Sequence, residues 1–199
     1  MTHTTTPAPE TVSDTKRRIM KAVAPLFAER GYGAVGTVEI GSVSGFGKGA
    51  LYHHIGSKEA LLYSIMTVYL NDLLEEARRL VAQIKETEGR IHALSLGLIS
   101  AVIQDNAEMT VCFREVHALS PDTRRAVLRL HGDYYRLWES VINEARERSE
   151  MRHIDPDELK ALLGMYFYSF LWIPPSRVGD IEALADKFAG LVLRACRPD

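Results

Sequence analysis

The residues best suited to chemistry lie in the stretch 41–54, GSVSGFGKGALYHH, which places four glycines and a lysine within nine positions. Such a cluster can cradle phosphates in a nucleotide-binding loop, or it can form the tight turn that delivers a helix to DNA. A P-loop needs a glycine five residues before its Gly-Lys pair and Ser or Thr after the lysine, but these positions hold Ser42 and Gly49. A dinucleotide-binding fingerprint needs a preceding strand, whereas the preceding segment has helical periodicity. The stretch therefore favours a helix-turn-helix.

A helix-turn-helix consists of two short helices that cross steeply through a turn of three or four residues. We predict these helices over residues 37–44 and 48–55. Gly45 between them can adopt the positive φ that the bend requires. The small residues Gly41 and Ser44 would allow the two helices to approach closely.

The second of these helices is expected to lie in the major groove, with its N-terminal residues against base edges. Small residues there let the backbone approach the DNA, and basic or hydroxyl-bearing residues can contact phosphates. The candidates of both kinds are Lys48, Gly49, Ala50, Tyr52, His53 and Lys58. Two alternatives stay open: Tyr52 can be a packing residue, and the glycines can serve only close helix packing in a small bundle.

Nearly every other segment also has helical periodicity, and no alternating strand pattern of any length occurs, so we predict an all-α protein. We expect a disordered N-terminal tail over residues 1–12 and a helix-turn-helix DNA-binding domain over residues 13–56. Residues 57–199 are expected to form a helical effector-binding and dimerisation domain. Its first helix is long and is capped by Ser57.

Composition and charge are those of an ordinary globular protein, with 46% hydrophobic and 25% charged residues. No apolar run is long enough for a membrane span, and the first 16 residues do not resemble a secretory signal. Cys112 and Cys196 show no disulfide framework, which is consistent with a reducing cytoplasm. The net charge is −2, but residues 1–60 carry seven basic and five acidic side chains. A mildly basic head on an acidic body fits a DNA-reading module on a larger regulatory domain.

The segment 19–62 resembles the TetR family of bacterial transcriptional regulators. The matching residues are Leu26-Phe27-Ala28-Glu29-Arg30-Gly31-Tyr32, Ile40, Gly45, Lys48-Gly49-Ala50-Leu51-Tyr52-His53-His54 and Ser57-Lys58-Glu59-Ala60-Leu61. The resemblance implies a homodimer that binds a palindromic double-stranded DNA operator, usually as a repressor, and that is released by a small effector bound to the C-terminal domain. It implies no enzymatic activity and no cofactor. The positions that match DNA contacts of the family are Thr37, Lys48, Gly49, Ala50, Tyr52, His53 and Lys58. The chain departs from the family pattern at Gly36 and Gly47, where hydroxyl side chains are usual.

The effector pocket is expected in the C-terminal domain, because a sensor pocket is a mostly apolar cavity with few polar groups. Aromatic, methionine and nearby polar residues of this half are the candidates, although many of them can equally be core residues. They are Met109, Phe113, Arg114, His117, His131, Tyr134, Tyr135, Trp138, Met165, Tyr168 and Trp172. This half is also similar to TetR regulators of fatty-acid and sterol degradation, which implies a small apolar or acyl-CoA-like effector.

The last two predicted helices, over residues 157–173 and 179–195, are apolar around most of their circumference. Such helices need a partner surface, so we expect them to pair with their two-fold mates as a four-helix bundle.

Two pairs of residues could indicate a metal site or catalysis. His53 and His54 are neighbours on a helix and point apart, and no third ligand stands at metal-binding spacing, so we expect no metal site. Cys112 and His117 could form a nucleophile–base pair, but five residues apart on a helix they do not face each other. The alternative function is an all-helical small-molecule-binding protein or enzyme that does not use its N-terminal domain on DNA.

Overall fold

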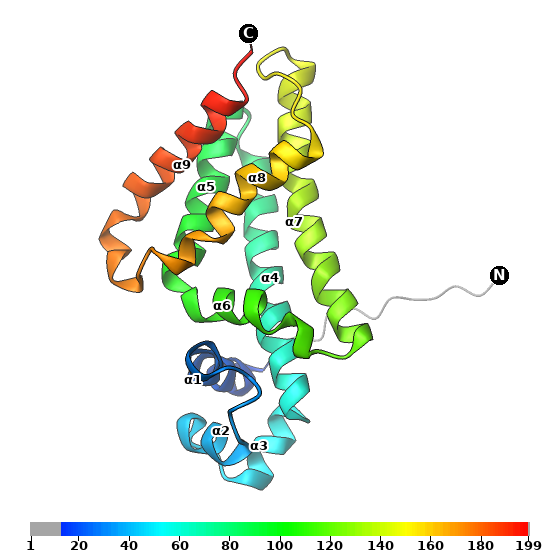
Figure 1. Cartoon of the computed structure of the whole chain (residues 1–199), viewed down its shortest axis with the longest axis vertical. Coiled ribbons are helices and arrows are strands. Elements are labelled where there is room, and N and C mark those ends of the chain that lie inside the picture. The colour runs from blue at the N-terminus through cyan, green and yellow to red at the C-terminus, as the bar shows by residue number, and fades with distance from the viewer. Residues whose placement is uncertain (1–12, 199) are drawn as a thin grey trace, which may run out of the picture.

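The computed structural model describes residues 13–198, and all regular secondary structure in that range is helical, which confirms the predicted all-α fold (Figure 1). The predicted disordered tail, residues 1–12, lies outside the described residues. The α-helices are α1 (Asp14–Arg30), α2 (Thr37–Ser44), α3 (Lys48–Ile55), α4 (Lys58–Gln83), α5 (Thr87–Gln104), α6 (Asn106–Arg114), α7 (Pro121–Glu147), α8 (Pro156–Phe167) and α9 (Ile181–Ala195). One short 3₁₀ segment follows α6, at Val116–Ala118, and two lie between α8 and α9, at Ser169–Leu171 and Pro175–Asp180.

Helices α1 to α3 form a small unit at one end of the molecule (Figure 1). Ser13 caps α1, since its side chain accepts a hydrogen bond from the backbone N–H of Lys16 at 3.3 Å. Ile19, Val23 and Phe27 recur at helical spacing on one face of α1 and are fully buried. They form the centre of the core against which α2 and α3 pack.

The turn between α2 and α3 has the geometry that its glycines predict. Gly45 adopts a left-handed conformation, with φ 76° and ψ 18°, and the N–H of Phe46 donates to the carbonyl of Gly41 at 3.0 Å. A Cβ atom added at Gly41 would lie 2.8 Å from the carbonyl oxygen of Phe46. The backbone of the turn therefore folds back against α2 too closely for a side chain at position 41 to fit without displacing it.

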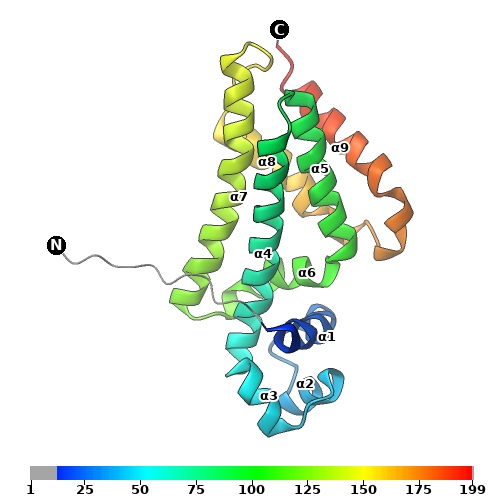
Figure 2. The ribbon, with the colours of Figure 1, turned by 180° about the vertical axis from the view of Figure 1, so that it is seen from behind.

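Helix α4 joins this unit to the rest of the molecule (Figure 2). Its N-cap Ser57 accepts a hydrogen bond from the N–H of Ala60 at 3.0 Å. Leu61 and Leu62 in its first turns are fully buried. Farther along, α4 runs between α5 and α7, so one helix belongs to both halves of the protein.

Helix α8 ends at Phe167, earlier than the predicted boundary near residue 173, and a 3₁₀ turn follows. The Ser169 hydroxyl donates to the carbonyl of Tyr166 at 2.6 Å, and such side-chain bonds compete with continuation of a helix. The last helix also begins slightly later than expected, at Ile181.

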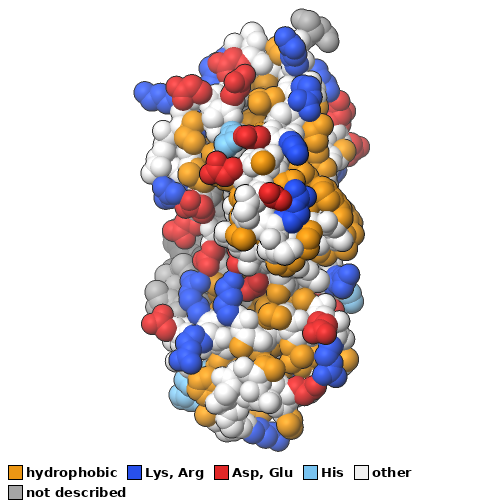
Figure 3. Space-filling model, turned by 90° about the vertical axis from the view of Figure 1, so that its left-hand side faces the viewer, with side chains coloured by type: hydrophobic (Ala, Val, Ile, Leu, Met, Phe, Trp, Pro, Cys, Tyr) orange, Lys and Arg blue, Asp and Glu red, His pale blue; other side chains and the backbone are white. Residues whose placement is uncertain are grey.

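Five large apolar side chains near α8 and α9 are exposed, and we call them the α8–α9 face. Their exposed fractions lie between 45% and 65%. Figure 3 shows hydrophobic side chains gathered along one side of the molecule at mid-height. The residues of the α8–α9 face are Tyr168, Leu171, Trp172, Val178 and Leu191.

We expect Gly41→Ala to destabilise the protein by about 1–3 kcal/mol, because the new methyl group must displace the backbone of Phe46. The measurement is thermal or urea unfolding of the purified chain. Gly49→Ala is the matched control, since a Cβ at Gly49 meets nothing within 4 Å and alanine favours a helix. Equal unfolding midpoints for the two variants would contradict the close contact between Gly41 and the turn at Phe46.

Candidate DNA-recognition helix and effector cavity

Helix α3 has one buried and one exposed side. Leu51 and Ile55, four residues apart, are 0% and 2% exposed and anchor the helix in the core of α1 and α2. The opposite side presents the predicted DNA-contacting residues to solvent. They are Lys48, Gly49, Ala50, Tyr52 and His53. The helix is therefore held mainly by two buried side chains and offers the exposed side to a partner.

The two remaining predicted DNA contacts lie beside this helix. Thr37 is the first residue of α2, is half-buried, and lines a shallow hollow together with Lys48. Lys58 is more constrained: its Nζ donates to the carbonyl of Tyr32 at 2.5 Å and lies 4.1 Å from the centroid of the Tyr32 ring. Partial burial lowers the pKa of Lys58, and Glu115 offsets part of that effect. The Lys58 ammonium group has further N–H groups that a phosphate could accept.

Gly36 and Gly47, the departures from the family pattern, are the N-caps of α2 and α3, and neither helix has a side-chain cap from these positions. At α2 the carboxylate of Glu39 substitutes in part, because it accepts the N–H of Gly36 at 3.0 Å. The same carboxylate forms an ion pair with Arg30 of α1. The hydrogen bond from Gly36 and the Arg30 pair lower the pKa of Glu39.

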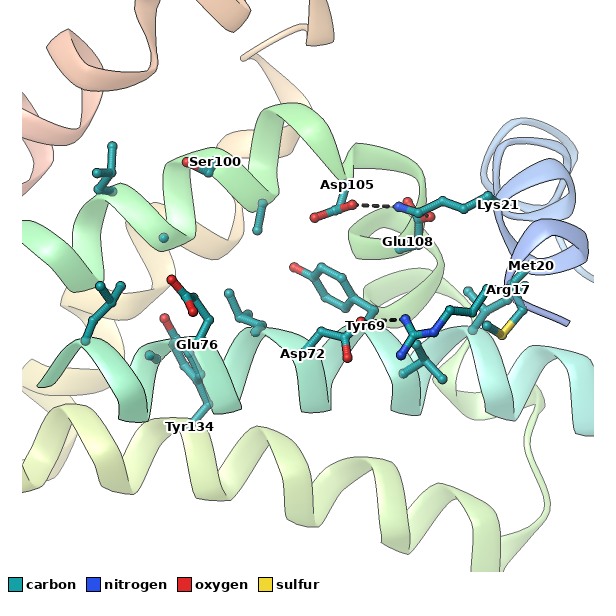
Figure 4. A pocket seen from close by; sticks show the side chains of 18 of the residues that line it. Arg17, Met20, Lys21, Tyr69, Asp72, Glu76, Ser100, Asp105, Glu108 and Tyr134 are labelled. Atoms are coloured by element: carbon teal, nitrogen blue, oxygen red, sulfur yellow. Dashed lines mark hydrogen bonds and ion pairs between the residues drawn. The ribbon is translucent and has the colours of Figure 1, made fainter. Parts of the chain in front are cut away.

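A cavity of about 650 Å³ lies beside α4, bounded by α1, α5 and α6 and by one residue of α7 (Figure 4). Its space arises on α5, where small residues recur at helical spacing and face the apolar side of α4. A Cβ atom added at Gly97 would meet nothing within 4 Å. The small residues of this stripe are Ala93, Gly97, Ser100 and Ala101.

The rim of the cavity joins the helix-turn-helix unit to the rest of the protein through ion pairs. Lys21 of α1 bonds Asp105 at 2.7 Å and Glu108 of α6 at 2.8 Å, and Arg17 bonds Asp72 of α4 at 2.9 Å (Figure 4). Burial alone would lower the pKa of Lys21, but the hydrogen bonds to both carboxylates raise it above the usual value. A molecule in the cavity would therefore lie against residues that hold α1 in place.

Tyr69 and Tyr134 line the cavity, and their hydroxyls are buried in its wall. No group within residues 13–198 accepts a hydrogen bond from either hydroxyl, and the indole N–H of Trp138 lies near that of Tyr134. The interior is otherwise largely apolar, formed by residues such as Ile65, Leu73 and Leu94. A small, mostly apolar molecule is the kind of ligand that suits these walls.

Of the predicted effector residues, Tyr134 lines this cavity, and the others lie elsewhere. Met109 and Trp138 are fully buried core residues. Tyr168 and Trp172 are exposed on the α8–α9 face, at 65% and 59%. The structure thus separates residues that the sequence grouped into one pocket.

The other predicted effector residues form a second aromatic region or reach the surface. Phe113 packs against His131, with ring centroids 5.5 Å apart, and burial lowers the pKa of that histidine. The Tyr135 hydroxyl donates to the carbonyl of Pro156 at 3.1 Å. Met165 is half-buried, and the polar candidates Arg114 and His117 are exposed.

Among the residues that the structure describes, the surroundings of Cys112, His117 and His54 do not form a catalytic or metal-binding site. Cys112 is 1% exposed, and burial raises the pKa of its thiol far above the usual range, whereas His117 is exposed. The His54 ring packs edge-on against Phe46, with centroids 5.3 Å apart. Within the described chain no group of three or more His, Cys, Asp or Glu residues is arranged to hold a metal ion. No helix in that range is both long and apolar enough to cross a bilayer.

Most residues of the cavity wall were not predicted from the sequence, because the prediction was based on large aromatic and methionine side chains. The signal that could have located it is the repetition of Ala93, Gly97, Ser100 and Ala101 at helical spacing. Small residues on one face of an apolar helix leave space where a core helix would carry Leu or Ile. Tyr69 of α4 was also not predicted. Its place in the cavity wall becomes evident only from the packing of α4 against α5.

Comparison with known proteins agrees with this architecture. The repressor KstR2 of Rhodococcus jostii is 27% identical to the chain over 192 residues, which is 94% of each protein. The solved ketosteroid transcriptional regulator KstR2 of Mycobacterium tuberculosis superposes with a TM-score of 0.83 at 20% identity, covering 97% of this chain and 100% of that one. AibR, solved in complex with isovaleryl coenzyme A and operator DNA, superposes with a TM-score of 0.78 at 27% identity, covering 89% and 97%.

Two family profiles match the chain and together include both of its halves. The profile described as tetracyclin repressor-like, C-terminal domain, matches residues 84–196, more than half of the chain. The profile described as bacterial regulatory proteins, tetR family, matches residues 19–65, which contain α2 and α3. The predicted resemblance is confirmed, and the alternative of an enzyme or unrelated binding protein is not favoured. The chain belongs to the tetR family of bacterial regulatory proteins.

Proposed function

We propose that this protein is a homodimeric transcriptional repressor that binds a palindromic operator through α3 and leaves it when an effector occupies the cavity beside α4. The observation that carries this proposal is the two-sided character of α3, anchored by Leu51 and Ile55 and otherwise free for DNA. In this scheme residues 13–56 bind DNA, and residues 57–199 bind the effector and dimerise. Because its operator is chromosomal DNA, we place its site of action in the bacterial cytoplasm.

The exposed side of α3 suits the major groove. Gly49 and Ala50 are small enough for the backbone to come close to the bases, while Lys48, Tyr52 and His53 can contact phosphates or base edges. The N-terminal end of α3 has no side-chain cap, so its backbone N–H groups are open to a phosphate.

Dimerisation is supported by the α8–α9 face. Apolar side chains as exposed as Trp172 and Leu191 are unfavourable in water when they gather in one patch, and a two-fold mate presents the same patch. A dimer of this kind would hold two α3 helices at one spacing. Half-sites on one face of DNA lie about 34–36 Å apart, or a multiple of that distance, so a small change in spacing disrupts binding.

The effector is proposed to be a small apolar or acyl-CoA-like molecule. The cavity volume of about 650 Å³ falls within the range of small-molecule pockets, and its walls are largely apolar. AibR, which shares the fold, was solved with isovaleryl coenzyme A. An acyl group would fit among the apolar walls, and the bulky polar part would remain at the charged rim.

Coupling between effector and DNA would pass through α1 and α4. The cavity is lined by α1 residues such as Met20, and the ion pairs of Arg17 and Lys21 connect α1 to α4, Asp105 and α6. An effector that displaces these residues would move the helix-turn-helix unit as a body. By linkage, DNA would weaken effector binding by the same factor by which the effector weakens DNA binding.

We expect Lys48→Ala to weaken binding to the DNA upstream of the protein's own gene and to reduce the salt dependence of log Kd by about one unit, as for one lost phosphate contact. Gel shift or fluorescence anisotropy at several salt concentrations measures both effects. Lys160→Ala is the matched control, because Lys160 is exposed on α8 and pairs with Asp157. An unchanged salt slope in Lys48→Ala would remove this residue from the interface.

Trp172→Glu should convert the dimer to a monomer at micromolar concentration, since the dimer would bury an unpaired carboxylate. Light scattering coupled to gel filtration gives the mass directly. Leu128→Glu replaces a comparably exposed leucine, 52% exposed on α7, and should leave the dimer intact. A wild-type chain that runs as a stable monomer would refute the dimeric proposal.

A series of Gly97→Ala, Gly97→Leu and Gly97→Phe should fill the cavity progressively while preserving operator binding. The larger side chains should raise the acyl-CoA concentration needed for release about tenfold or more, because they overpack the space that the ligand needs. Release is followed by gel shift with acyl-CoA esters of increasing chain length. If Gly97→Phe responds like the wild type, the effector binds elsewhere.

A further inference from the structure

Two phenol hydroxyls, those of Tyr69 and Tyr134, are buried in the wall of the effector cavity, and no group among the described residues accepts a hydrogen bond from either of them. The two residues are only 7% and 2% exposed. Buried polar groups nearly always have a partner, and leaving one unpaired is unfavourable. We infer that the effector is an apolar molecule whose buried part carries an uncharged oxygen acceptor, such as a carbonyl, which receives hydrogen bonds from Tyr69 and Tyr134. This inference rests on the proposed function and specifies the chemical class of its effector.

The two tyrosines reach the cavity from different helices and at different places. In Figure 4, Tyr69 extends from α4 toward Asp105, whereas Tyr134 comes from α7. A ligand that lies along α4 can therefore meet one hydroxyl or both.

A third buried tyrosine shows how this fold treats such a group where no ligand is needed. Tyr166 is fully buried, and its hydroxyl shares a 2.7 Å hydrogen bond with the Ser95 hydroxyl. That pair lies outside the lining of the cavity. Tyr69 and Tyr134, which line the cavity, have no such acceptor, and the one other unpaired buried side-chain polar atom of the described residues is Nε1 of Trp138, next to Tyr134 in the core.

Both cavity tyrosines are hydrogen-bond donors at neutral pH. Burial is the main cause that raises the pKa of Tyr69 and of Tyr134, so each hydroxyl keeps its proton. A neutral phenol can donate one hydrogen bond, and a carbonyl oxygen can accept one or two. The ligand must then bring the acceptor that the protein lacks.

The charges around the cavity favour an uncharged buried group. Each carboxylate on the rim already faces a cation, so neither an ammonium nor a carboxylate on the ligand would find a free counter-ion inside. Arg18 has no ion-pair partner within residues 13–198, but it is exposed and can meet only a group that stays in water. The existing pairs are Arg17–Asp72, Lys21–Asp105, Lys21–Glu108 and Arg79–Glu76.

The test uses matched compounds on two carbon skeletons, titrated into the full chain without DNA. Undecane, 2-undecanone, undecylamine and undecanoate form one set, and decalin with its ketone, amine and carboxylate forms the other. Each ketone should bind roughly three- to tenfold more tightly than its hydrocarbon for each hydrogen bond gained, and the charged compounds should bind more weakly than the ketone. Thermal shift and isothermal calorimetry measure the affinities.

Tyr69→Phe and Tyr134→Phe should reduce the preference for ketone over hydrocarbon while leaving hydrocarbon affinity unchanged. Because each removes an unpaired buried hydroxyl, the ligand-free variants should melt at the wild-type temperature or above. Tyr166→Phe is the control: it breaks the bond to Ser95, so it should melt lower and keep the full ketone preference.

The inference is overturned if no ketone binds more tightly than its hydrocarbon, if an amine or carboxylate binds best, or if both phenylalanine variants keep the wild-type preference. Gel shift on the upstream DNA, run separately, tests the proposed function. A chain that prefers ketones but binds no DNA contradicts the proposed function alone. A chain that binds and releases its DNA but prefers charged ligands contradicts this inference alone.

Discussion

The continuity of α4 is the constraint on which the rest of the structure depends. Its 26 residues form a rod about 39 Å long, with Leu61 and Leu62 in the core of the helix-turn-helix unit and Tyr69 to Leu80 along the cavity. A helix without a break transmits a tilt or shift at one end to the other. The ion pairs of α1 add a second, weaker connection, because exposed pairs such as Arg17–Asp72 each contribute only about 0–1 kcal/mol. The buried contacts of α4 fix the position of the helix-turn-helix unit, and the weak ion pairs of α1 allow that unit to shift.

The DNA-binding half could be predicted almost completely from local sequence. Its geometry depends on backbone requirements that few residues meet: a left-handed conformation at Gly45 and, at Gly41, a close approach of the Phe46 carbonyl that leaves no room for a methyl group. The alternation of buried Leu51 and Ile55 with exposed neighbours also follows directly from helical periodicity. Side-chain reach is less predictable, and Lys58 illustrates this, since its contact with Tyr32 depends on a residue 26 positions away.

For the effector-binding half, the sequence predicted the helices but not the cavity. The position of the cavity depends on how the helices pack against one another. Bulky aromatic residues drew attention to α6, α7 and the segment after α8, yet Trp138 fills the core and Trp172 belongs to the exposed α8–α9 face. The cavity instead arises where α5 carries small residues, and a sequence does not show which helix lies opposite them. The end of α8 at Phe167 has the same origin, since the Ser169 side chain competes with the backbone in a way that periodicity does not reveal.

The division of labour on α3 has a consequence for how such regulators diversify. Leu51 and Ile55 are the buried residues of this helix, so changes on its exposed side remove no contact within the core. A duplicated copy of the gene could therefore acquire a new set of promoters through a few surface substitutions, while still reporting on the same metabolite. Rewiring of a regulatory circuit in this lineage requires no compensating change in the interior of the molecule.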